Sequence, residues 1–245
     1  MPTNPVAYIP ILTTILATVF TAALVHRWRT RRTGPHLLWW ALGTLTFALG
    51  TITESLTTLI GWHEPIFRAW YITGALLGGA PLAQGTVYLL LSRRVANWLT
   101  TVLVTVIVIA SVCVLLSPIH YELVEPHRLS GKVLVWQWVR AFSPFINTYA
   151  FLFLVGGAIL SAVRYAGDPA TRHRFIGNVC IAIGAILPGI GGSFTRFGYT
   201  EVLYVTEFLG LGLIFLGYRA IVAGGTAASG MRQEARGTEA LGVGN

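Results

Sequence analysis

The sequence predicts an all-α integral membrane protein with seven transmembrane helices. Hydrophobic residues make up 54% of the 245 residues, charged residues only 11%, and the mean hydropathy is +0.68. Soluble domains carry about 25% charged residues, so water is a poor solvent for most of this surface. Seven apolar runs are long enough to cross a bilayer, and they lack the strict alternation of barrel strands.

Each transmembrane helix needs about 20 mostly apolar residues to cross about 30 Å of hydrocarbon. The expected segments are Val6–His26, Leu37–Gly61, Ile66–Leu91, Trp98–Leu116, Ala141–Val163, Phe175–Thr195 and Val202–Val222. These segments predict a multi-pass plasma-membrane protein in contact with the lipid bilayer. Sixteen of the 17 Lys and Arg residues are Arg, which indicates a GC-rich bacterial genome.

The charges of the connecting loops predict an external N-terminus and a cytoplasmic C-terminus. Twelve basic residues fall in the loops after the first, third and fifth segments or near the tail, and five fall on the opposite side. Cytoplasmic loops carry the excess of Lys and Arg. The same asymmetry explains the net charge of +8 without nucleic-acid binding.

Residues 1–222 are expected to form one transmembrane domain, and 223–245 a disordered cytoplasmic tail rich in Gly, Ala and polar residues. Within the domain, 6–94 and 140–222 fit a parallel repeat with the fourth segment as a linker, a three-plus-one-plus-three arrangement. Residues 47–52 match 181–186 at an offset of 134, and Tyr71-Ile72-Thr73 matches Tyr204-Val205-Thr206 at 133. Common apolar composition is the competing explanation.

Two carboxyl groups lie inside the predicted spans, Glu54 and Glu207, both in the outer third of the bilayer. A charge in the membrane costs about 2.5–3.5 kcal/mol at a helix centre, so both are candidate site residues. Glu54 and Arg68 belong to consecutive segments and are candidates to pair across the bundle. Further candidates for an outward-facing ligand pocket gather at the outer helix ends: Arg68, Tyr71, Arg140, Arg196 and Tyr204. The alternative is that these groups only anchor helix ends and satisfy one another.

Two other stretches have unusual local chemistry. Pro188 and Gly189 predict a kink or break in the sixth segment, because proline removes a backbone donor. The outer loop 120–127 holds two His and two Glu, but their spacing matches no metal-ligand motif, and a solvated polar loop is the simpler interpretation.

These observations favour a carrier or ligand-binding module for a small or lipophilic solute. A sensory or assembly subunit that acts through a partner protein, or as a homo-oligomer, is the first alternative. A membrane enzyme acting on lipid or isoprenoid substrates is the second, and it is disfavoured because no nucleophile, P-loop or metal motif is present. No cofactor is expected, since the last segment lacks a lysine for retinal and no His lies near the middle of a predicted span.

Overall fold

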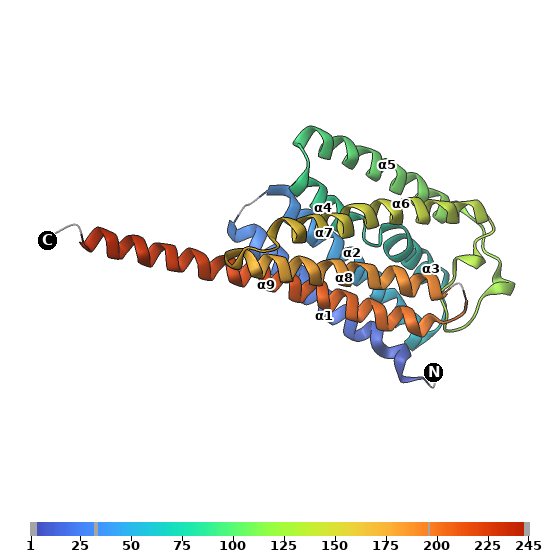
Figure 1. Ribbon diagram of the computed structural model, residues 1–245. Helices are drawn as coiled ribbons and strands as arrows, with labels where there is room; N and C mark the ends of the chain where they lie inside the picture. Colours follow the sequence, from blue (N-terminus) through green and yellow to red (C-terminus); the bar gives the residue numbers. More distant parts are fainter. Residues whose placement is uncertain (1–3, 32–33, 196, 243–245) are drawn as a thin grey trace.

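The protein is a bundle of long helices (Figure 1). The computed structural model describes residues 4–31, 34–195 and 197–242, with side chains through residue 225. In this part of the chain there is no β-strand, only two isolated bridges in the outer loop. The longer elements are α1 (Ile9–Arg31), α2 (Gly34–Ile60), α3 (Glu64–Trp70), η2 (Tyr71–Leu77), α4 (Ala80–Leu90), α5 (Arg93–Leu116), α6 (Phe142–Ala150), η6 (Phe151–Val155), α7 (Gly156–Tyr165), α8 (Arg172–Thr195) and α9 (Thr200–Gly242).

Among the described residues, five helices are long and apolar enough to cross a membrane, which makes this an all-α protein of the membrane class. They cover Pro5–Arg31, Arg93–Leu116, Gln137–Tyr165, Pro169–Thr195 and Thr200–Gly225. The two other expected spans differ from these for identifiable reasons. In α2, six threonines and Glu54 lower the hydropathy, and the third span is divided among α3, η2 and α4.

Six helical rods form a closed ring in the described part of the chain. They are α1, α2, a third rod made of α3, η2 and α4, a fourth made of α6, η6 and α7, and then α8 and α9. α1 packs against α2, α2 against α4, α4 against α6 and η6, α7 against α8, α8 against α9, and α9 returns to α1. α5 lies outside this ring at the edge of the bundle (Figure 1). It is attached through Gln84 of α4, which is fully buried and donates to Thr100 Oγ1 of α5 at 2.7 Å while accepting from the Tyr149 hydroxyl of α6.

The third rod contains the main irregularity of the bundle. The chain passes through the π-helix η2 and then a turn at Gly78, whose φ of +39° favours glycine, before α4 restarts with Pro81 in its first turn. α9, the counterpart of this rod in the expected repeat, is continuous. The two halves therefore differ at this point.

The predicted helix break at Pro188 and Gly189 is not an interruption of the chain, because α8 runs unbroken through both residues. Its neighbour α9 accommodates the proline. A Cβ on Gly210 would lie 2.9 Å from Pro188 Cδ and 2.6 Å from the Gly184 carbonyl oxygen, so the missing side chain leaves room for both. The Gly184 carbonyl, which the proline deprives of a helical donor, thus packs against the Gly210 backbone.

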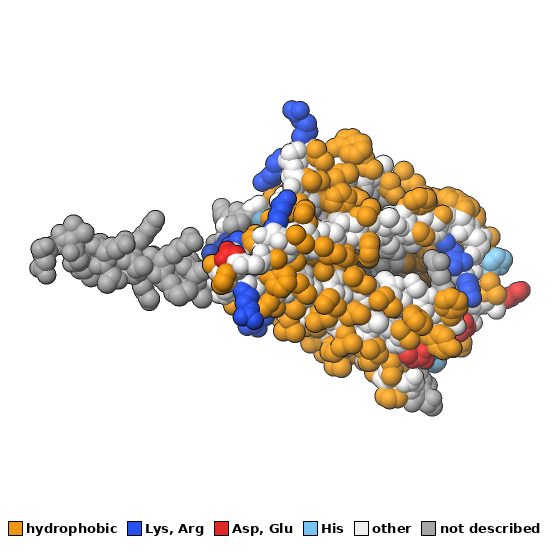
Figure 2. Space-filling view, viewed as in Figure 1, with side chains coloured by type: hydrophobic (Ala, Val, Ile, Leu, Met, Phe, Trp, Pro, Cys, Tyr) orange, Lys and Arg blue, Asp and Glu red, His pale blue; other side chains and the backbone are white. Residues whose placement is uncertain are grey.

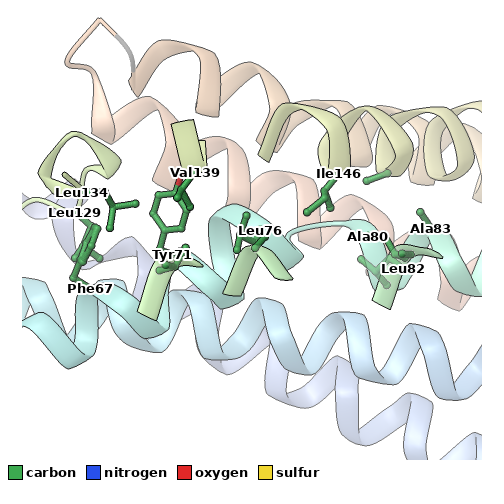
Figure 3. Packing of buried hydrophobic residues seen from close by; sticks show 14 of the residues in the cluster. Phe67, Tyr71, Leu76, Ala80, Leu82, Ala83, Leu129, Leu134, Val139 and Ile146 are labelled. Carbon is green, nitrogen blue, oxygen red and sulfur yellow. The ribbon is translucent and has the colours of Figure 1, made fainter. Parts of the chain in front are cut away.

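The outer loop folds over one end of the bundle: residues 120–127 are mostly exposed, as predicted for a solvated polar segment, whereas several residues that follow are buried. Leu129, Val133, Leu134 and Val139 are buried against Phe67 and its neighbours in the largest apolar cluster (Figure 3). The backbone is tied down as well. Trp62 N donates to Pro126 O at 2.7 Å, and an Arg128 guanidinium nitrogen donates to Thr195 O at 3.3 Å.

α9 continues as a helix to Gly242, which differs from the disordered tail predicted for 223–245. The continuation leaves the bundle at the end opposite to the outer loop (Figure 1). On the face of the bundle shown in Figure 2, apolar side chains predominate between the two ends, and basic side chains lie at the ends. An apolar surface of this extent is typical of contact with lipid.

Candidate functional site

Three of the residues predicted from the sequence come together near the outer end of the ring: Glu54, Tyr204 and Glu207. The carboxyl groups of Glu54 on α2 and Glu207 on α9 lie within hydrogen-bonding reach of each other, and Tyr204 lies near both. Glu54 is 4% exposed, and Tyr204 is buried too. The expected repeat assigns α2 to the first half and α9 to the second, so this contact joins the two halves.

Glu54 is positioned by the polar face of α2. Thr53 and Thr57 bind carbonyl oxygens three or four residues earlier, which satisfies their hydroxyl groups within the helix. Trp70 of α3 donates its indole N–H to Glu54 Oε1 at 3.0 Å. The second oxygen, Glu54 Oε2, is buried and has no hydrogen-bond partner among the described residues, and the same is true of Glu207 Oε2.

Arg68 does not pair with Glu54. It forms an ion pair with Glu64 at 2.7 Å and donates to the carbonyl oxygens of Val114 and Ser117. Glu64 lies at the outer surface and also accepts from the Tyr121 hydroxyl. That hydrogen bond, and then the one from Arg68, lowers the pKa of the Glu64 carboxyl, while the pKa of Tyr121 is raised by the same contact. Arg68 therefore fixes the end of α5 to α3.

The remaining candidates do not join this cluster. Tyr71 is buried under the outer loop, where a Cβ on Gly131 would lie 2.7 Å from Tyr71 Cε2 and 3.5 Å from Arg140 Nε. Arg140 itself is exposed and donates to Gln137 at 2.8 Å. Arg196 lies outside the described residues. Of the seven ligand-binding candidates, the structure thus groups three in one place and two in another.

A cavity of about 420 Å³ lies at the opposite end of the ring, where α9 leaves the bundle. All six rods of the ring contribute to its wall, so the cavity lies between the two expected halves. Its deeper wall is largely apolar and includes Phe20, Trp40, Leu82 and Ile214. The cavity thus lies at the basic end, which the sequence predicts to be cytoplasmic, and not at the outer end where a pocket was expected.

The mouth of the cavity is positively charged. Arg27, Arg31 and Arg174 line it, and no acidic residue does so among the described lining residues. Two of the guanidinium groups lie on aromatic rings, Arg27 at 5.9 Å from the Tyr218 centroid and Arg174 at 5.3 Å from that of Tyr165. Such stacking orients a guanidinium group; Arg174 also donates one N–H to the Tyr165 hydroxyl at 3.4 Å, and its other N–H groups are positioned to bind an anion.

Sequence reasoning assigned Arg27, Arg31 and Arg174 to membrane orientation only and did not identify them as site residues. A signal existed in the aromatic residues near the same helix ends, Tyr165 and Tyr218. Their approach to the arginines depends on how α7, α8, α9 and α1 pack, which no local pattern encodes.

Within the described residues, no group of three or more His, Cys, Asp or Glu is arranged to hold a metal ion. Cys113 and Cys180 are free thiols. The chain matches no protein-family model, no curated protein and no solved structure in the comparisons made with each.

Proposed function

We propose that this protein is a seven-span, carrier-type membrane module that binds an amphipathic anion in the cavity at its cytoplasmic end. In this proposal the N-terminus is external and the two halves of the ring, 6–94 and 140–222, are a parallel repeat linked by α5. The ligand would place its apolar part between the halves and its anionic group among the arginines at the mouth.

The observation that carries the proposal is the combination of apolar walls and an uncompensated basic mouth. None of Arg27, Arg31 and Arg174 forms an ion pair within the described residues. Arginine is well suited to binding carboxylate or phosphate because its planar N–H groups fit two oxygens at once. Pockets of about 300–1,000 Å³ accommodate ligands of drug size, and this cavity of about 420 Å³ falls in that range.

The order of the ring supports a carrier rather than a simple receptor. Around the ring, the three rods of the first half lie next to one another, and so do the three rods of the second half. The contacts α1–α9 and α4–α6 form the two junctions between the halves. Related halves around a central site are the arrangement that allows one half to rock against the other. The outer loop closes the outer end, which favours a state open only at the basic end.

Binding is tested by thermal unfolding of the purified protein in a non-ionic detergent, with dodecyl phosphate as the probe. A ligand that binds only the folded protein stabilises it by about 2.7 kcal/mol at a hundredfold excess over its Kd. We expect stabilisation by dodecyl phosphate, less by dodecanol, and none by dodecyltrimethylammonium.

Arg174→Gln and the cavity-filling Ser161→Phe should each remove most of this stabilisation. Arg164→Gln is the matched control, because Arg164 lies at the same end of the bundle but is not among the residues that line the cavity. Equal stabilisation of the wild type and the Arg174 and Ser161 variants would refute the proposal. It would shift attention to the sensory or assembly alternative and to a search for a partner protein.

A further inference from the structure

The contact between Glu54 and Glu207 is the most unusual chemistry in the bundle. Glu54 is buried, Glu207 is partly buried, and the two carboxyl groups lie within hydrogen-bonding reach of each other in the outer half of the ring. Each also has an Oε2 atom without a hydrogen-bond partner among the described residues. Two ionised carboxylates are acceptors only, so they cannot bond to each other unless a proton lies between them.

No cation in the described structure balances two negative charges at this place. α1 carries no charged side chain over 9–25, and α8 carries none over 175–195. On α3, Arg68 is engaged by Glu64 and by two carbonyl oxygens, and Trp70 supplies a neutral donor.

The remaining titratable groups near the pair belong to α9 and the outer loop. Tyr204 lies near both carboxyls, and the charges of Glu201 and Arg128 also act on that tyrosine. Arg128 is held by Glu125 and by the Thr195 carbonyl, and His127 contacts the carbonyl of Thr57 on α2. None of these groups forms an ion pair with Glu54 or Glu207.

We infer that Glu54 and Glu207 form a proton-binding site in which one proton is shared between the two carboxyl groups. Carboxyl groups in contact cannot both ionise without strong repulsion, and the aspartic-protease dyad shares a proton for this reason. A shared proton gives the two groups a hydrogen bond in a place where each has an oxygen without a partner among the described residues. Because α2 and α9 belong to opposite halves, it also holds the outer ends of those halves together.

This inference does not depend on the anion site at the other end of the ring. Loss of the proton would leave two adjacent carboxylates, whose repulsion would push α2 from α9 and loosen the outer closure. The carboxyl pair is therefore suited to couple proton release to opening of the outer end.

Infrared spectroscopy of the reconstituted protein tests the inference through the carbonyl stretch of a protonated carboxyl group. We expect one such band at neutral pH. Glu54→Gln and Glu207→Gln should each shift or remove this band, because the remaining carboxyl group no longer shares a proton with a carboxylate. Glu201→Gln, an exposed glutamate near the start of the same helix, is the matched control and should leave the band unchanged.

The wild-type protein provides a second measurement that requires no variant. Raising the pH should remove the band as one proton and lower the unfolding temperature over the same range. Retention of half the band in each single variant would show two independent protons and overturn the shared site. Absence of the band at neutral pH, together with stabilisation by sodium, would overturn it in favour of a bound cation.

Discussion

At the scale of single residues, the charged groups of the outer end divide into two kinds of contact. Glu64 and Arg68 form an ion pair at the surface of the bundle, and Tyr121 joins them from the outer loop. Glu54 and Glu207, by contrast, face each other inside the ring without a counterion in the described residues. The first arrangement fixes an element in place, whereas the second stores a proton.

Glu64 should make the stability of the outer end sensitive to acid. Tyr121 and Arg68 both favour the carboxylate, so the pKa of Glu64 is lower in the folded protein than in the unfolded chain. The stability it contributes is complete above the ordinary pKa and is lost as the pH falls through the folded value. Glu64→Gln should therefore cost about 1 kcal/mol or less at neutral pH, as expected for a surface ion pair, and nothing in acid.

Thermal unfolding of the wild type and the variant across this pH range checks the prediction. Glu122→Gln serves as the control, since Glu122 is an exposed carboxyl of the outer loop, next to Tyr121. A Glu64 effect that stayed constant as the pH fell would contradict it.

Sequence reasoning at this scale located the unusual residues but not their partners. Glu54 and Glu207 stood out because a carboxyl group in an apolar run is costly. The contact between Glu54 and Glu207 joins helices that are far apart in the chain. Arg68 binds Glu64, four residues away on the same helix, and also binds backbone carbonyls at the end of α5.

At the scale of elements, α8 and α9 are the most closely packed pair of helices. Gly177, Gly184 and Gly191 recur every seven residues on α8 and face Gly217, Gly210 and Leu203 on α9, which also recur every seven. Because the glycines have no side chains, the two backbones approach closely and interact by van der Waals contact, which drives helix association in lipid.

Gly184→Ala should weaken this helix pair. An added Cβ would lie 2.5 Å from the carbonyl oxygen of Gly210, a backbone atom that cannot move aside easily. The expected loss is about 1–3 kcal/mol of stability, the usual cost of overpacking. The measurement is the unfolding temperature in detergent.

Gly189→Ala on the same helix is the matched control. A Cβ there meets no atom within 4 Å, so the variant should be as stable as the wild type or slightly more stable because alanine favours the helix. Equal destabilisation by the two substitutions would show that α8 needs flexibility at its glycines rather than close contact with α9.

At the scale of the whole molecule, the ring and its orientation decide where a ligand can enter. The outer loop covers one end, and the basic mouth opens at the other. The loop charges predict the direction in the membrane and, on that prediction, the mouth faces the cytoplasm.

Cysteine labelling in intact cells tests this orientation and whether the helix Gln137–Tyr165 crosses the membrane. In a Cys113→Ala/Cys180→Ala background, Glu122→Cys should react with a membrane-impermeant maleimide, and Ala170→Cys should react only after permeabilisation. Both positions are exposed and lie at opposite ends of the bundle. Reaction of both from the same side would contradict the seven-span topology, and the reverse pattern would invert it.

The sequence by itself determined the membrane class and the helical character, because long apolar runs and the shortage of charge are local and additive properties. It also indicated which carboxyl groups are expensive to bury. Only the tertiary structure decided that α8 passes through Pro188 unbroken, that the outer loop forms a cap, and that the cavity lies at the basic end. These features depend on contacts between distant segments, where the missing side chain of one helix makes room for a proline or a carbonyl of another. A pattern read along the chain contains no information about which helices become neighbours.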